Sequence, residues 1–284
     1  MKQSSVLLAA CTAALLSLPA AAVTVTYSDF ADLSGFQRNG SAASIANPAT
    51  DGLNRQVLRL SDDLFQSGSA FLTNTINLAN NASFSTAFSF RISNPQGISE
   101  IDGPGADGIV FVVQTVSNTA GGVGGGIGYE GIIKSVGVEF DTWNNGSGTF
   151  NDPDGNHVGI NLDGGFNGPT TPIGTRMNNA ADWFAWVDYD GVNGIMEARL
   201  SETFVRPSAS TLTLTGLDLV SVLGQTDAYI GFTSGTGSAG GDHDVVNWTF
   251  RDDFAPLNVT PEPGSLALLG AAAIALVAAR RRRV

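Results

Sequence analysis

Five side chains within one short stretch have the types and spacing of metal ligands. Glu139 and Asp141 are two residues apart, and side chains two apart on a β-strand project from the same face. Two adjacent carboxylates repel each other unless a cation lies between them. Asn145 and Asp152 add oxygens downstream, and His157 adds a nitrogen. Oxygen ligands suit calcium, whereas carboxylates with one imidazole suit manganese or a similar transition ion.

Two better-known binding loops do not fit the same region. The stretch 152–156 reads Asp-Pro-Asp-Gly-Asn, but the position where a calcium EF-hand loop needs glycine is His157. On its own, this stretch is typical of a solvated turn. The glycine run 121–128 is not a phosphate cradle, because no helix follows it and no lysine stands where a P-loop needs one.

Short alternating segments must position these residues. Glycine accounts for 35 of 284 residues and charged residues for 14%, and no helical periodicity is sustained. Alternation of apolar and polar residues, bounded by Gly, Asn, Asp or Pro, predicts strands at 23–27, 84–92, 108–113, 136–140, 184–189, 196–200, 228–232 and 245–250. A hairpin turn is expected at 190–194 and a short helix at 218–223. Many short strands without crossover helices indicate an all-β, antiparallel β-sandwich.

The middle of the chain resembles a known family. Glu139 to Asn145 reads E-x-D-x-aromatic-x-N, and Asp152 to Ile160 reads D-P-x-x-x-H-aliphatic-G-aliphatic. Both patterns resemble those of legume-type (L-type) lectins. The stretches 65–71, 83–91, 105–109, 185–191, 229–237 and 243–250 look like other strands of that family. The resemblance therefore covers nearly all of residues 23–251 and implies the concanavalin-like jelly-roll fold of legume lectins.

The resemblance also implies two metal sites. Glu139, Asp141, Asp152 and His157 would hold a transition metal, expected to be manganese. Asp141, the Trp143 backbone carbonyl, Asn145 and Asp152 would hold calcium, so that the two aspartates bridge both ions. The interval from Asn145 to Asp152 is longer than in many members of the family, which leaves Asp154 as an alternative to Asp152.

A carbohydrate site beside the metals follows from the same resemblance. Asp107, a backbone N–H of the glycine run at Gly126 and the Asn145 side chain would bind sugar hydroxyls, while Trp143 would stack on a sugar face. Either neighbour within 124–126 remains an alternative to Gly126. The Ala106–Asp107 bond matches a cis peptide of the family. The loop 235–242 would help to select the sugar.

Both ends of the chain resemble sorting signals. Residues 1–22 contain Lys2, an apolar run from Val6 to Leu18 and an Ala-x-Ala site, which is typical of a secretory signal peptide. After a linker at 252–260, residues 261–284 combine Pro-Glu-Pro, an apolar run and four arginines. This tail resembles the PEP-CTERM signal of Gram-negative bacteria, which an exosortase processes. We expect export through the inner membrane, transient anchoring by a short transmembrane helix, and delivery to the cell surface or extracellular matrix.

Charge and cysteine content exclude other classes. Removing Lys2 and the four terminal arginines from 14 basic residues leaves nine, and removing Glu262 from 26 acidic residues leaves 25, so residues 23–260 carry a net charge near −16. So acidic a surface repels phosphate backbones, which excludes a nucleic-acid partner. The single cysteine, Cys11, lies in the predicted signal peptide, so neither disulfides nor thiol chemistry is expected.

Three functions remain to be compared. The first is a secreted, non-enzymatic lectin that uses calcium and manganese to bind exopolysaccharide or a surface glycan. The second is an adhesive matrix protein whose metals serve only the fold. The third is a jelly-roll glycoside hydrolase, but Trp143 and Asn144 occupy the positions where such an enzyme needs its second catalytic carboxylate. Family members often pair through the back sheet, so a homodimer is also expected.

Overall fold

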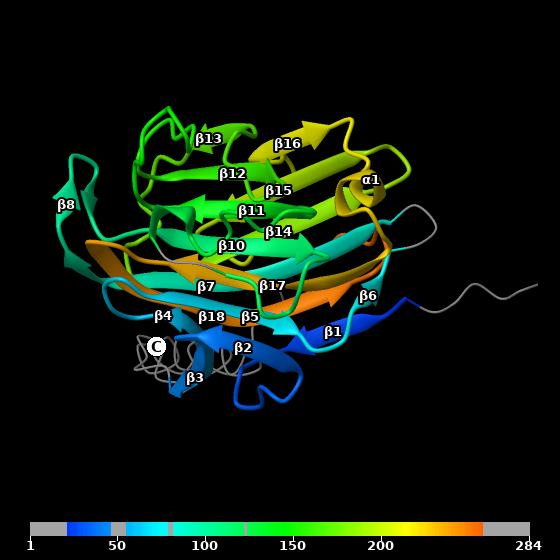
Figure 1. Ribbon diagram of the computed structural model, residues 1–284, viewed down its shortest axis with the longest axis horizontal. Helices are drawn as coiled ribbons and strands as arrows, with labels where there is room; N and C mark the ends of the chain where they lie inside the picture. The colour runs from blue at the N-terminus through cyan, green and yellow to red at the C-terminus, as the bar shows by residue number, and fades with distance from the viewer. Residues whose placement is uncertain (1–21, 47–54, 79–81, 122–123, 258–284) are drawn as a thin grey trace, which may run out of the picture.

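The computed structural model describes residues 22–46, 55–78, 82–121 and 124–257. The predicted signal peptide up to residue 21 and the predicted sorting tail lie outside these residues. Two antiparallel β-sheets account for almost all regular structure in the described ranges (Figure 1). No helix in these ranges is both long enough and apolar enough to cross a membrane, and the apolar run 265–279 lies outside them.

One sheet, here called the back sheet, has the long strands β7 and β18 near its centre. Its order is β16 (Leu212–Thr215), β15 (Ile195–Ser201), β14 (Trp183–Asp190), β7 (Phe84–Gly97), β18 (Ala239–Arg251), β4 (Gln56–Ser61) and β3 (Ala43–Ala46). Strand β1 (Thr24–Tyr27) also pairs with β18.

The other sheet, the front sheet, carries the predicted metal ligands. Its order is β13 (Thr170–Pro172), β12 (His157–Leu162), β11 (Ser135–Asp141), β10 (Gly108–Gln114), β17 (Asp227–Gly235), β5 (Ser67–Leu72) and β2 (Phe36–Gly40), with β6 (Ile76–Asn77) also on β17. A small hairpin of β8 (Ser99–Glu100) and β9 (Gly103–Pro104) projects from one end of the sandwich (Figure 1). A 3₁₀ turn (η1) spans Gly124–Gly126, and helix α1 spans Leu219–Leu223.

The main core lies between the two sheets and is rich in phenylalanine. Phe88 of the back sheet meets Phe232 of the front sheet edge to face, with ring centroids 5.0 Å apart. Phe90 and Phe140 also lie 5.0 Å apart across the same gap. Because alternate residues of β11 up to Phe140 point into this core, Glu139 and Asp141 must point to the outer side of the front sheet.

A second, smaller core lies on that outer side. Loops around Tyr129 and Phe166 cover Phe71, Val110 and Val112 of the front sheet, and all five side chains are buried. The Tyr129 hydroxyl donates to the carbonyl oxygen of Asn161 at 3.1 Å, which ties the covering loop to β12.

The predicted fold class is confirmed, and one predicted loop is wrong. Each predicted strand is present, and the predicted short helix begins after Asp218, whose side chain caps it. Residues 235–242 are not a loop. Gly235 ends β17, and Ala239 already begins β18, so only 236–238 connect them. Long-range pairing of Ala239 with Gly97 on β7 extends the strand into a glycine-rich segment that alternation does not mark.

Candidate metal centre and carbohydrate site

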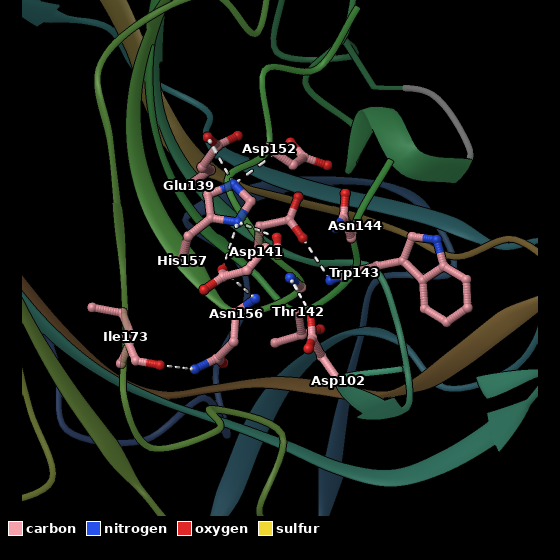
Figure 2. Close-up of polar contacts among 12 residues, drawn as sticks. Asp102, Glu139, Asp141, Thr142, Trp143, Asn144, Asp152, Asn156, His157 and Ile173 are labelled. Atoms are coloured by element: carbon pink, nitrogen blue, oxygen red, sulfur yellow. Dashed lines mark hydrogen bonds and ion pairs between the residues drawn. The ribbon is translucent and has the colours of Figure 1, made fainter. Parts of the chain in front are cut away.

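The predicted transition-metal ligands converge at the junction of β11 and β12. Asp141 pairs with His157 in the register of the two strands, and Glu139 pairs with Gly159. Figure 2 shows Glu139, Asp141 and Asp152 arranged around the His157 ring. His157 Nε2 lies 3.6 Å from Glu139 Oε1 and 3.6 Å from Asp152 Oδ1. Such spacing suits atoms that share one ion, because ligands about 2.1 Å from a metal lie roughly 3 to 3.5 Å apart.

The histidine ring is oriented for metal binding. His157 Nδ1 lies 3.0 Å from the backbone carbonyl oxygen of Asp154. A carbonyl only accepts, so Nδ1 carries a proton, and in the neutral ring Nε2 keeps a lone pair for a cation. The Asp154 carboxylate lies on the other side of the ring, with Oδ1 3.8 Å from Nδ1. This geometry favours Asp152 over Asp154 as the ligand.

Several of the buried ligand atoms have no hydrogen-bond partner among the described residues. Glu139, Asp141 and His157 are at most 1% exposed, and one ligand atom from each can be chosen within 4.8 Å of the others. Both carboxylate oxygens of Glu139, one of Asp152 and Nε2 of His157 are buried without a hydrogen bond among the described residues. Buried polar atoms are normally satisfied. These residues therefore fit a bound divalent cation.

The pKa shifts of the clustered residues indicate an excess of negative charge at this site. Burial raises the pKa of Asp152 to about 6, although the Asn145 N–H and His157 oppose the shift. Burial and the neighbouring Glu139 and Asp152 carboxylates raise the pKa of Asp141 well above its ordinary value. Burial alone would lower the pKa of His157, but the carboxylates of Glu139 and Asp152 raise it above 6.5. Protons are thus held where a metal ion would otherwise neutralise the charge.

The predicted calcium ligands occupy the loop that follows β11. The Trp143 N–H donates to Asp141 Oδ1 at 2.6 Å, and the Asn145 N–H donates to Asp152 Oδ2 at 2.5 Å. The loop is thereby closed onto both bridging aspartates. Asn145 is exposed and Trp143 half-buried, and the indole points away from the carboxylates (Figure 2).

The predicted sugar-binding residues also lie close to this loop. The Ala106–Asp107 peptide bond is cis, and the Asp107 carbonyl accepts from the Thr142 N–H at 2.9 Å. The Asp107 carboxyl is 4% exposed, and its Oδ2 has no hydrogen-bond partner among the described residues. Burial, with Asp152 and Glu100 adding to it, raises the pKa of Asp107 to about 7.

Within the glycine run, Gly125 rather than Gly126 faces Asn145. A Cβ placed on Gly125 would lie 2.3 Å from Asn145 Nδ2, whereas one on Gly126 would meet Glu130. The turn 236–238 lies alongside, because the Gly124 N–H donates to Thr236 O at 3.2 Å. A Cβ on Gly237 would lie 4.0 Å from Asp107 Oδ2. Asp107, Gly124–Gly126, Asn145 and Gly237 therefore gather around one patch of surface.

Two carboxylates that the sequence pattern does not mark, Glu100 and Asp102, hold the metal loop against the β8–β9 hairpin. Glu100 Oε2 accepts from the Asn144 N–H at 3.0 Å, and Asp102 Oδ2 accepts from the Gly155 N–H at 2.9 Å. Gly155 permits this approach, since a Cβ there would lie 1.9 Å from Glu100 Oε1. Asn144 lies 44 residues from Glu100 in sequence, so no local spacing indicates the pairing.

Comparisons with known proteins define the family. Residues 23–263 match the legume lectin domain model, and residues 259–283 match the PEP-CTERM protein-sorting motif. The chain therefore belongs to the legume lectin domain family and carries a PEP-CTERM motif.

Individual relatives support the family at moderate identity. The L-type lectin-domain containing receptor kinase VIII.1 of Arabidopsis thaliana is 30% identical over 181 residues, which are 61% of this chain and 24% of that protein. The match thus spans about a quarter of the kinase. The bark lectin of Styphnolobium japonicum is 28% identical over 60% of this chain and 61% of the lectin. A crystal structure of basic winged bean lectin with Tn-antigen aligns with a TM-score of 0.64, at 24% identity, over 81% of this chain and 98% of that one.

Proposed function

We propose that this protein is a non-enzymatic lectin that binds an exopolysaccharide or surface glycan at a site organised by calcium and manganese. The observation that carries the proposal is the convergence of Glu139, Asp152 and His157, whose buried ligand atoms have no other partner among the described residues. Family membership and the resemblance to a lectin crystallised with Tn-antigen support a carbohydrate ligand.

Each metal would have its own ligand set. Glu139, Asp141, Asp152 and His157 would hold the transition ion, and Asp141, Asn145, Asp152 and the Trp143 carbonyl would hold calcium. When bound, these ions would supply the positive charge that keeps the buried aspartates ionised. The protein's own residues would contact the sugar. The Asp107 carboxylate would accept from sugar hydroxyls, the Asn145 amide would donate or accept, a backbone N–H of Gly124–Gly126 would donate, and Trp143 would offer an apolar face.

Export and surface sorting follow from the PEP-CTERM motif, whose processing implies an exosortase-type enzyme. We propose that the predicted signal peptide directs export, that the apolar run 265–279 anchors the precursor transiently, and that the lectin domain then acts at the cell surface or in the matrix. Binding of a matrix glycan would make such a protein an adhesive component as well.

A binding experiment tests the function. Residues 23–257 would be probed against neutral, amino-sugar and acidic bacterial polysaccharides with calcium and manganese, and again after EDTA. We expect binding that disappears with EDTA and in Asp107→Ala. Asp190→Ala, at the turn between β14 and β15, is the matched control and should bind normally. If both metals are retained but no glycan binds, the metals serve only the fold and the matrix-protein alternative is favoured.

A further inference from the structure

The outer face of the back sheet carries an apolar patch that is completely covered. Alternate residues of β7 and β14 point into the main core, so Ala87 and Trp186 point outward. Trp186 is nevertheless fully buried, and Ala87 is 3% exposed. Phe184 and Leu257 pack against them. An outward-facing tryptophan without exposure requires a covering segment, and Leu257 identifies the chain's own C-terminal portion as part of it.

Residues 252–257, here called the strap, cross the outer face of the back sheet from β18 toward β14. Asp252 exchanges backbone and side-chain hydrogen bonds with Val23, with the Val23 N–H donating to Asp252 Oδ1 at 2.6 Å. Further along, the Ala255 N–H donates to Ser85 Oγ at 3.1 Å. Leu257 then packs against the cluster of Ala87 and Trp186. Part of the predicted linker is therefore attached to the domain, over the middle strands of its back sheet.

Little free chain separates this attachment from the sorting motif. Pro261 of the Pro-Glu-Pro sequence is four residues after Leu257, a reach of about 14 Å when fully extended. The domain itself has an expected radius of gyration of about 17 Å. The metal ligands Glu139, Asp141 and His157 lie on the outer side of the opposite sheet. A tether this short does not reach around the sandwich.

We infer that the protein, while held by its sorting signal, turns the back sheet toward the anchoring surface and the metal centre away from it. If the proposed function holds, the orientation has a consequence for the ligand. The metal centre would bind a polymer that lies outside the anchoring surface, and not a headgroup sugar of the same membrane. The strap also occupies part of the face through which two copies are expected to pair, so pairing would have to accommodate or displace it.

The test measures which face of the anchored protein lies near the lipid. Residues 23–284, which lack the predicted signal peptide and contain no cysteine, would be reconstituted into vesicles that carry a headgroup acceptor dye. Donor dyes would be placed singly at Thr26→Cys, which is exposed on the outer face of the back sheet, or at Ser147→Cys, which is exposed in the metal loop. We expect severalfold stronger energy transfer from position 26 than from position 147.

Two further variants test whether the short tether and the attached strap cause the orientation. A twenty-residue Gly/Ser insertion after Asn258 should make transfer from the two positions nearly equal, as should Leu257→Asp, which releases the strap. Val192→Asp, at an exposed turn, is the matched control and should leave the difference intact. Equal transfer in the parent chain, stronger transfer from position 147, or failure of the chain to float with the vesicles would each overturn the inference. Glycan binding by residues 23–257 is measured separately, so failure of the lectin function is distinguishable from failure of the orientation.

Discussion

The two outer faces of the sandwich differ in whether their carboxylates have cationic partners within the chain. On the back sheet, Arg59 forms a two-bond pair with the buried Asp244 at 2.8 and 2.9 Å, and Arg91 pairs with the partly exposed Asp182 at 2.6 Å. On the front sheet, Glu139, Asp141 and Asp152 converge with only His157 beside them in the described structure. A buried charge needs a partner. The carboxylates of the back sheet have cationic partners within the chain, whereas the proposed metal ions would supply the positive charge beside those of the front sheet.

Removing the metals should reveal the largest difference between the two faces. EDTA is expected to abolish glycan binding and to lower the free energy of unfolding at pH 8 by about 4 kcal/mol, if the metals were present at 1,000 times their dissociation constants. Calorimetry with and without EDTA measures the loss. His157→Ala should behave like the EDTA-treated protein and should respond little to added manganese. An unchanged melting temperature after verified metal loss would contradict the comparison.

Breaking a back-sheet pair should cost stability regardless of metal. Arg59→Met leaves the Asp244 carboxylate, which is 1% exposed, without its two hydrogen bonds. We expect a loss of about 3 kcal/mol, of equal size with and without EDTA, by urea denaturation. Arg251→Met removes a half-exposed pair with Asp253 and serves as the control, with a loss below about 1 kcal/mol. A loss at Arg59 that depends on metal would show that the two faces are coupled.

The metal-free protein should become less stable as pH rises. Asp107 and Asp152 have folded-state pKa values of about 7 and 6, above the value of about 3.9 for an unfolded aspartate. Their raised pKa values contribute stability that is fully present below pH 4 and lost as pH rises through 6 and 7. Between pH 5 and 8, we expect a decrease on the order of a few kcal/mol in denaturant titrations with EDTA.

Metal should reverse this dependence. Bound cations compete with the protons, so metal affinity should fall as pH drops below about 7. In calcium and manganese, the protein should therefore be more stable at pH 8 than at pH 5. The same slope with and without metal would argue against these aspartates as ligands.

The smallest expected change in the free energy of unfolding is a gain, opposite in sign to the loss expected for Arg59→Met. In the metal-free protein, Glu139→Gln removes one of several converging carboxylates, which should raise the free energy of unfolding by about 1 kcal/mol. The same variant should bind manganese far more weakly, since it loses an ionised ligand. Asp163→Asn, an acidic residue in a loop outside the cluster, is the comparison variant. Destabilisation of metal-free Glu139→Gln would show that this carboxylate has a stabilising partner.

Much of the front-sheet site is visible in sequence because its ligands lie close together in the chain. Glu139 and Asp141 share a strand face, and a loop of only fifteen intervening residues returns to His157. The back-sheet pairs are not visible, since Arg59 and Asp244 are 185 residues apart. The same holds for the Glu100–Asn144 contact and for the strap. Alternation predicted eight strands, but it missed the internal strands β4 and β12 as well as short edge strands such as β3 and β13, whose pairing is decided by tertiary contacts.

The small core beneath the loops of the front sheet affects the heat-capacity change expected on ligand binding. Tyr129 and Phe166 stack edge to face, with centroids 5.7 Å apart, and they pack the covering loops against β10 and β12 before any glycan arrives. A sugar that binds beside such loops pays little entropy to order them. The heat-capacity change on binding should accordingly be small and scale with the apolar sugar surface buried, without the large negative contribution that folding of a binding loop would add.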